Sequence, residues 1–335
     1  MTAAEANLSP TQRRRMESLR AALGPIVGYL EDSTVVEIMR NPDGSVWVEH
    51  QGSAPKRVDA VLSDPDTTRF VGLVAAELGV EISASSPSLA AKLPGWGARL
   101  QATVPPVVEA PCFCLRMPPK RIFTLHDYVK AGTLSADQAQ ILKQGVLDRR
   151  NILVAGSTGS GKTTLINALL HALAGTQERI VLIEDTPELQ CAAENRVGIL
   201  VQPPLYTWQR AIMDVKRQRP DRIVLGEVRD GAALEMIKAW NSGHPGMCTI
   251  HSDSAKGALD QLCMLIEEVV PSAPRGQVAR TVDIVVHIKR DSLAPSGRSI
   301  TSITEVLGME GDEWQLRDAT IQPPDPTSEA TLINR

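Results

Sequence analysis

The chain has 335 residues, a formal net charge of −4 and five cysteines. Its length predicts about two domains, and its slightly acidic balance provides no global positive field that would attract nucleic acid. The cysteines form no C-x-x-C pair, residues 1–20 lack the apolar region of a signal peptide, and no apolar run of about 18 residues is present. We therefore expect a cytoplasmic protein without a membrane-spanning helix.

The first part of the chain mixes helices and strands. Ser9-Pro10-Thr11-Gln12 has the form of a capping box, and Gly24-Pro25 should interrupt the helix that it starts. Two β-rich runs bracket Asn41-Pro42-Asp43-Gly44, which predicts a β-hairpin. The expected elements are this hairpin over 35–39 and 45–49, a helix over 67–78, and strands over 98–104 and 112–116. Together they predict a smaller N-terminal α+β domain over residues 1–116.

The second part of the chain alternates short apolar strands with helices. A proline-containing basic segment, 117–124, is the expected linker, and residues 323–335 are expected to form a disordered tail. Between them the predicted helices are 125–131 and 135–147, and the predicted strands are 152–155, 180–184, 223–226, 247–251 and 282–288, followed by a hairpin over 300–307 and 314–316. This alternation predicts an α/β domain over 125–322, with a mainly parallel sheet covered by helices on both faces.

Residues 156–163 fit the P-loop pattern G-x-x-x-x-G-K-T between an apolar strand and a helix. Its glycines allow backbone N–H groups to point at a polyphosphate, Lys162 should reach the β and γ phosphates, and the Thr163 hydroxyl can bind Mg²⁺. The expected nucleotide-binding residues are Gly156, Ser157, Thr158, Gly159, Ser160, Gly161, Lys162, Thr163 and Thr164. The alternative is a Gly-Ser loop that joins strand to helix without a ligand.

Carboxylates follow two of the later strands. Ligands of parallel α/β sheets bind beyond the carboxyl ends of the strands, so polar residues there carry extra weight. Glu184 ends the strand 180–184, Asp185 and Glu188 follow it, and Glu227 follows the strand 223–226. These side chains could bind Mg²⁺ directly or through water, or could orient an attacking water. The alternatives are a solvated turn with acidic helix-capping residues for the segment 184–188, and a single acidic residue at a strand end for Glu227.

His244 and His251 lie on either side of the strand 247–251. His251, at its carboxyl end, could sense a γ-phosphate, although a buried histidine with a structural hydrogen bond is the alternative. The pair is a poor metal site because no third ligand has suitable spacing. Arginines could stabilise the charge that develops during phosphoryl transfer. The candidates are Arg99, Arg116, Arg121, Arg217, Arg219, Arg222 and Arg229.

These motifs, in this order behind a P-loop, resemble the secretion-system traffic ATPases of type II secretion, type IV secretion and type IV pili. Within that superfamily the chain is most similar to the TrbB-type conjugative-transfer ATPases. The resemblance covers the segments 37–49, 97–116, 156–163, 184–188, 219–229 and 243–251. The four-cysteine zinc module found in many type II secretion and pilus-assembly members is missing, which favours the shorter conjugation and type IV secretion branch.

The resemblance implies a RecA-like C-terminal domain, a PAS-like N-terminal domain and a homohexamer that binds ATP and Mg²⁺ between the two domains of a protomer. It implies that Arg99 and Arg116 reach the phosphates. Glu188 would position the attacking water and Glu227 would be the Mg²⁺ partner, although these two roles could be exchanged. Glu184 and Asp185 would contact the ion partly through water. Arg219 and Arg222 match the family's arginine box, and which of them acts across subunits stays open.

The function implied is that of an ATP hydrolase that energises a conjugative-transfer or type IV secretion apparatus through interdomain motion. Such a protein would work at the inner face of the cytoplasmic membrane with inner-membrane components of the apparatus. Two alternatives stay open, a type IV pilus motor and a nucleotide-gated assembly switch with little turnover. The net charge of −4 makes no strong case for direct binding of nucleic acid.

Overall fold

The computed structural model describes residues 9–51, 53–118 and 122–320. The chain divides into two compact units, Met1–Lys120 and Arg121–Arg335, which are described separately here. Arg121 and part of the predicted linker 117–124 lie outside the described residues, as does the predicted tail 323–335. Among the helices that are described, none is both long enough and apolar enough to cross a bilayer.

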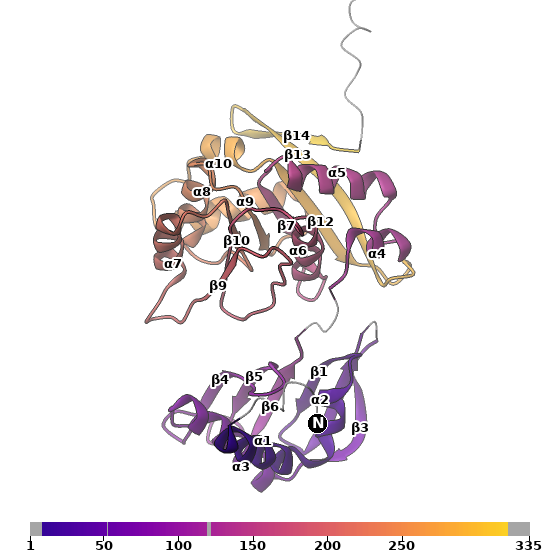
Figure 1. Cartoon of the computed structure of the whole chain (residues 1–335), viewed down its shortest axis with the longest axis vertical. Helices are drawn as coiled ribbons and strands as arrows, with labels where there is room; N and C mark the ends of the chain where they lie inside the picture. The colour runs from indigo at the N-terminus through magenta and orange to yellow at the C-terminus, as the bar shows by residue number, and fades with distance from the viewer. Residues whose placement is uncertain (1–8, 52, 119–121, 321–335) are drawn as a thin grey trace, which may run out of the picture. The chain divides into compact units, whose positions relative to one another are not determined.

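The first unit contains a six-stranded antiparallel sheet in the order β3-β2-β1-β6-β5-β4 (Figure 1). Its helices are α1 (Pro10–Leu23), α2 (Val27–Glu31) and α3 (Asp64–Leu78), and its strands are β1 (Val35–Arg40), β2 (Ser45–His50), β3 (Lys56–Val61), β4 (Ser88–Lys92), β5 (Arg99–Thr103) and β6 (Cys112–Arg116). The predicted α+β character is confirmed, whereas the finer PAS-like assignment stays a prediction.

Local sequence signals explain most boundaries of the first unit. Ser9 and Gln12 form the expected capping box of α1, and a short 3-10 turn, Gly24–Ile26, separates α1 from α2. The helix α3 begins earlier than predicted because Ser63 caps it, with a proline in its first turn. The strands β3 and β4 were not predicted. Both lie at edges of the sheet, where the apolar pattern is weak because one side of the strand has no neighbour.

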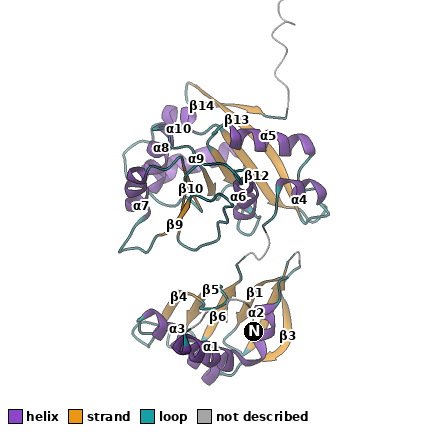
Figure 2. Cartoon of the chain, in the orientation of Figure 1, coloured by secondary structure: helices purple, strands orange, loops and turns teal. Residues whose placement is uncertain are grey.

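The second unit contains an eight-stranded sheet in the order β14-β13-β12-β7-β11-β10-β8-β9. Its strands are β7 (Ile152–Ala155), β8 (Ile180–Glu184), β9 (Arg196–Leu200), β10 (Arg222–Leu225), β11 (Met247–Ile250), β12 (Ile284–Arg290), β13 (Arg298–Glu310) and β14 (Glu313–Asp318). Its α-helices are α4 (Leu125–Lys130), α5 (Ala136–Leu147), α6 (Lys162–His171), α7 (Trp208–Val215), α8 (Ala232–Asn241), α9 (Ala255–Glu267) and α10 (Arg275–Thr281). Figure 2 distinguishes these helices and strands by colour.

The sheet is parallel from β12 to β9, and β13 and β14 extend it as an antiparallel hairpin. This arrangement confirms the predicted parallel sheet and its added hairpin. The strands β7 and β8 have the predicted limits, whereas β12 begins two residues later than predicted and runs to Arg290. The edge strand β9 was not predicted, because its residues alternate between exposed and half-buried and include Gly198.

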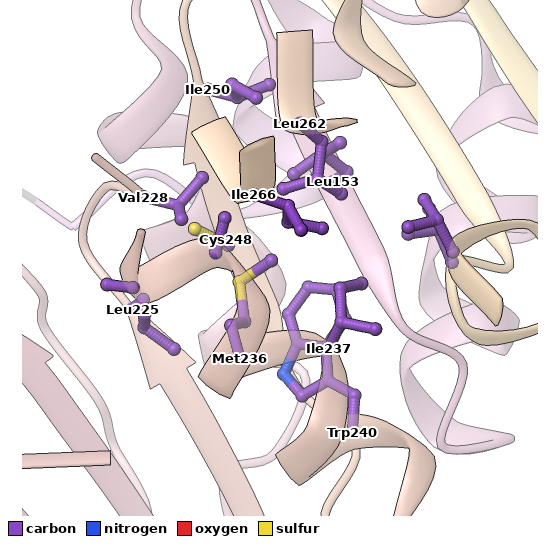
Figure 3. Packing of buried hydrophobic residues seen from close by; sticks show 14 of the residues in the cluster. Leu153, Leu225, Val228, Met236, Ile237, Trp240, Cys248, Ile250, Leu262 and Ile266 are labelled. Carbon is purple, nitrogen blue, oxygen red and sulfur yellow. The ribbon is translucent and has the colours of Figure 1, made fainter. Parts of the chain in front are cut away.

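Helices cover both faces of this sheet. Neighbouring residues of one strand point to opposite faces, so Leu153 belongs to the core under α7, α8, α9 and α10, while Ile152 belongs to the core under α4, α5 and α6. Figure 3 shows part of the first core, in which Leu225, Cys248 and Ile250 from the strands lie near Met236, Ile237, Trp240, Leu262 and Ile266 from α8 and α9. The carboxyl ends of β7, β8, β10 and β11 thereby meet at one edge of a buried sheet.

Candidate functional site

The P-loop connects the end of β7 to the start of α6. Gly159 and Gly161 have φ angles of 69° and 100°, which other residues rarely adopt. Gly156 is needed for space, because a Cβ atom there would lie 2.3 Å from the carbonyl oxygen of Ile288. These glycines therefore allow the tight turns of this loop, and α6 begins at Lys162 with its N-terminus at the loop. Phosphate binding by the loop stays a prediction.

Lys162 lies at the centre of this loop and is only 8% exposed. Its Nζ atom donates hydrogen bonds to the carbonyl oxygens of Gly156, at 2.9 Å, and Ser157, at 3.0 Å. The same ammonium lies 3.2 Å from Nδ1 of His251. The half-buried Thr163 and Thr164 follow in the first turn of α6. A cationic group is thus held at the mouth of the loop by neutral acceptors.

His251 joins Lys162 to Glu227. An ammonium can only donate, so Nδ1 of His251 accepts, the ring proton sits on Nε2, and Nε2 faces Oε1 of Glu227 at 3.2 Å. Burial and the charge of Lys162 lower the pKa of His251. Their effect is larger than that of the nearby Glu227 carboxylate, which raises the pKa. The imidazole is consequently neutral near pH 7. Its proton is on Nε2, so that Nδ1 can accept from Lys162 and Nε2 can donate to Glu227.

Arg229 joins Glu227 to the acidic segment after β8. Its Nη2 lies 2.8 Å from Oε2 of Glu227, and its Nη1 lies 2.9 Å from Oδ2 of Asp185. Burial alone would raise the pKa of Glu227, but the hydrogen bond and charge of Arg229, together with the nearby His251 and Lys162, lower it overall. Glu227 is therefore held ionised at the strand end where the sequence predicts a carboxylate.

Glu184 is the last residue of β8 and is only 5% exposed. Its Oε1 atom accepts hydrogen bonds from the backbone N–H groups of Glu188, at 2.8 Å, and Leu189, at 2.7 Å. Burial raises the pKa of Glu184 to about 7 despite these two hydrogen bonds, and the nearby carboxylates of Glu188 and Asp185 raise it further. One of its oxygens thus organises the following loop, and its predicted contact with Mg²⁺ stays a prediction.

Asn167, on α6, connects the P-loop helix to the segment that carries Glu188. Its Nδ2 donates to the carbonyl oxygen of Glu188 at 3.0 Å, and its Oδ1 accepts from the backbone N–H of Gln190 at 2.8 Å. Asn167 is only 2% exposed, so both hydrogen bonds lie away from water. The sequence did not single out Asn167, because an amide in the middle of a helix carries no local signal of such a partner.

Three predicted residues lie at the opposite edge of the sheet. Arg222 begins β10, is 2% exposed and contacts Glu178 through its Nε at 2.6 Å. His244 precedes β11 and pairs with Ser242, while Arg219 follows a 3-10 turn and lines a pocket of about 400 Å³. In a parallel sheet these amino ends are the edge away from the P-loop. The structure therefore brings Lys162, Glu227 and His251 together, and leaves these three residues apart from them.

In the first unit, Arg99 and Arg116 are direct cross-strand partners on β5 and β6. Neighbours across an antiparallel pair share one face of the sheet, so the two residues form a local cationic pair. Arg116 also lies 3.9 Å from Glu37 on β1. Their predicted contact with phosphates stays a prediction.

Two arginines that the sequence did not single out lie against the P-loop. Arg290 ends β12 and donates from Nε to the carbonyl oxygen of Gly159 at 3.2 Å. Arg298 begins β13, and its Nε lies 3.2 Å from the position of a Cβ on Gly161. The pairing of β12 with β13 places these arginines opposite each other. The sequence alone does not show this proximity. It follows from the strand order, in which β12 lies next to β7, the strand that leads into the P-loop.

The site suits an ion that arrives with a ligand. In the residues that the structure describes, no cluster of three or more His, Cys, Asp or Glu side chains could hold a metal by itself. The donors available near the P-loop are the Thr163 hydroxyl and the carboxylates of Glu227 and Asp185. Such a sparse oxygen set fits Mg²⁺, which keeps several waters and takes further ligands from phosphates.

The comparison with known proteins identifies relatives over most of the chain. Residues 20–316 match the family model described as Type II/IV secretion system protein. A probable conjugal transfer protein TrbB from Sinorhizobium fredii is 40% identical over 309 residues, which cover 90% of this chain and 93% of that protein. The type IV secretion system protein VirB11 from Bartonella quintana is 32% identical, over 85% of this chain and 92% of that protein.

Solved structures with lower identity share the fold. The Legionella pneumophila ATPase DotB matches with a TM-score of 0.60 and 18% identity, covering 82% of this chain and 78% of that chain. The pilus retraction motor PilT, solved with ADP, matches with a TM-score of 0.60 and 19% identity, covering 94% and 86%. The predicted resemblance is thus confirmed at the level of the family and of the overall α/β fold.

Proposed function

Because this chain belongs to the Type II/IV secretion system protein family, we propose that it is an ATP hydrolase that energises a conjugative-transfer or type IV secretion apparatus. The observation that carries this proposal is the continuous line of contacts from Lys162 through His251 to Glu227. Lys162, which is expected to hold a terminal phosphate, follows β7. The contacts connect it to the carboxylate of Glu227, which follows β10, two strands away in the sheet.

This line of contacts suggests how nucleotide could be detected. Lys162 donates hydrogen bonds to two loop carbonyl oxygens and lies within hydrogen-bond distance of His251, and these three acceptors are neutral. Phosphate oxygens are charged and bind an ammonium more strongly, so a terminal phosphate would draw Lys162 away from His251. The imidazole would then be released from one of its two partners, and its contact with Glu227 could change.

The two glutamates suit different roles. Glu227 is held ionised by Arg229 and His251, as expected of a carboxylate that binds the water shell of Mg²⁺. Mg²⁺, when bound, would neutralise part of the charge on the phosphates. Glu188 lies on the segment held by Glu184 and Asn167, and we assign to it the positioning of the attacking water. The opposite assignment is the alternative.

Conjugative transfer is the function that we favour, because the TrbB protein shares 40% identity over most of both chains. The likeness to PilT, at 19% identity, concerns the fold alone and does not favour a pilus motor. By the family resemblance we also propose a homohexamer that acts at the inner face of the cytoplasmic membrane. Arg99 and Arg116 are proposed to contribute to nucleotide binding.

Phosphate release from ATP by the purified protein tests the proposal. We expect Lys162→Ala to abolish turnover, and Glu188→Gln to retain nucleotide binding while losing turnover. Lys143→Ala, which changes an exposed lysine on α5, is the matched control and should behave as the wild type. Steady turnover in the Lys162→Ala protein would refute the assigned roles. Ring formation with a non-hydrolysable nucleotide, but no phosphate release, would instead favour the assembly switch.

A further inference from the structure

The hairpin formed by β12 and β13 lies against all three glycines of the P-loop. A Cβ atom on Gly156 would lie 2.3 Å from the carbonyl oxygen of Ile288, and one on Gly159 would lie 2.3 Å from Nη2 of Arg290. A Cβ atom on Gly161 would lie 3.1 Å from Cδ of Arg298. The loop is therefore enclosed on its outer side by one backbone group and two arginine side chains.

The contact of Arg290 acts on the peptide group between Gly159 and Ser160. In a P-loop the N–H groups point inward to the phosphates, so a carbonyl that accepts from Arg290 points outward. A charged donor on the carbonyl polarises its peptide and strengthens the N–H at the other end. That N–H belongs to Ser160, which at present donates to the carbonyl of Ser157 at 3.2 Å. Arg290 thus strengthens a donor that can turn to a phosphate.

Among the described residues, no group compensates the charge of these two arginines or satisfies all of their N–H donors. Within residues 9–51, 53–118 and 122–320, no carboxylate forms an ion pair with Arg290 or Arg298. The Nε of Arg298 is buried and, in this described part of the chain, has no hydrogen-bond acceptor. Two neighbouring cations without counter-charges repel each other, and a bound anion would relieve that repulsion.

We propose that Arg290 and Arg298 are positioning residues, which hold the P-loop in its binding conformation and raise its affinity for the diphosphate part of a nucleotide. This inference rests on the proposed function, because it assumes that the loop binds nucleotide. The arginines approach the loop from β12 and β13, whereas His251 and Glu227 approach it from β11 and β10. We therefore assign nucleotide affinity to the two arginines on one side of the loop, and the hydrolytic step to His251 and Glu227 on the other side.

The test compares ADP binding, by calorimetry, in the wild type and in the double variant Arg290→Gln with Arg298→Gln. Hydrogen bonds that involve a charged group typically change affinity about tenfold or more when removed, so we expect about a tenfold rise in Kd for the double variant. ADP and ATP should be affected alike because they share the diphosphate. The kcat for ATP should stay close to that of the wild type once nucleotide is saturating.

Lys289→Gln is the matched control. Lys289 lies between Ile288 and Arg290, carries the same charge and, among the described residues, makes no hydrogen bond to the loop. An equal loss of affinity in this control would show a general effect of charge and overturn the positioning role. Arg290→Lys, which keeps the charge, should recover part of the lost affinity. If the double variant does not fold, Arg290→Gln alone decides, since that side chain is exposed.

The result also separates this inference from the proposed function. If the wild type binds ADP and Lys162→Ala weakens that binding, the P-loop works as proposed. An unchanged ADP affinity in the Arg290→Gln and double variants would then overturn the inference alone. If the wild type and Lys162→Ala bind ADP equally, or neither binds it, the proposed function itself fails.

Discussion

The Nε2 atom of His251 lies 3.2 Å from the Oε1 atom of Glu227, so the segment after β11 contacts the segment after β10. The other ring nitrogen faces Lys162, which belongs to the loop after β7. One imidazole therefore links three strand ends, and its neutral form is the only one that can accept from Lys162 while it donates to Glu227. Replacement of this ring should separate the hydrolytic step from nucleotide binding.

For His251→Ala we expect turnover to fall about 100-fold, as is typical when a group that aids proton transfer or charge positioning is removed. The affinity for ADP should change much less, because ADP lacks the terminal phosphate that we propose lies nearest to this ring. Phosphate release and calorimetric ADP binding measure the two effects. His171→Ala, which changes an exposed histidine at the end of α6, is the control. Equal losses in binding and turnover would contradict the role given to His251.

Arg229→Met should change the pH profile of kcat/KM. Arg229 donates to Glu227, and without it the burial of Glu227 would raise the pKa of that carboxyl. In the proposed function Glu227 binds the water shell of Mg²⁺ as an ionised carboxylate, so the acid limb of the profile should move to higher pH. Arg210→Met, an exposed arginine on α7, should leave the limb in place. An acid limb that stays unchanged in Arg229→Met would show that Glu227 does not control it.

The sequence predicts best the parts of this molecule that are buried on both faces. The strands β7 and β8 appear as unbroken apolar runs and have the predicted limits, and the polar residues beyond them follow directly. The edge strand β9 carries an alternating, half-exposed pattern that a loop could equally show. The edge strands β3, β4 and β9 are therefore the ones that the sequence did not predict, whereas the edge strand β14 was predicted as half of a hairpin.

The candidate site was predicted where chemistry follows a motif, and was missed where it depends on tertiary contacts. Lys162 could be chosen from the P-loop pattern, and Glu227 and His251 from their positions at strand ends. Arg290 meets Gly159 across 131 positions of sequence, and Asn167 meets Glu188 across 21. Conversely, Arg219, Arg222 and His244 were chosen by motif, yet they lie at the amino ends of strands. A motif specifies which residue types occur. The direction of the strand decides whether those residues lie at the carboxyl-end edge of the sheet, near the P-loop, or at the opposite edge.

Asn167→Ala should destabilise the second unit and loosen the segment that carries Glu188. It removes the partners of a buried carbonyl oxygen and of a backbone N–H, which typically costs about 1–3 kcal/mol. Urea unfolding measures the loss of stability, and phosphate release should fall in parallel because Glu188 is less well placed. Asn241→Ala, an exposed amide at the end of α8, should be nearly neutral. A fully stable Asn167→Ala protein would show that these hydrogen bonds contribute little.

Glu184→Gln should change how stability depends on pH. The pKa of Glu184 is raised from 4.5 to about 7, so the folded state holds its proton more tightly than the unfolded state does. The stabilisation that this group contributes is full below pH 4.5 and is lost as the pH rises to about 7. For a shift of this size the loss is about 3 kcal/mol, and glutamine, which does not titrate, avoids it while retaining an acceptor oxygen.

The free energy of unfolding of Glu184→Gln, relative to that of the wild type, should therefore increase between about pH 4.5 and pH 7 and level off above. Urea titrations of both proteins at several pH values give this difference directly, and other titrating groups cancel in it. A difference that stays constant with pH would mean that Glu184 ionises normally in the fold. Burial of its side chain would then be offset by the N–H groups of Glu188 and Leu189, and Glu184 would already be an ionised carboxylate at the strand end.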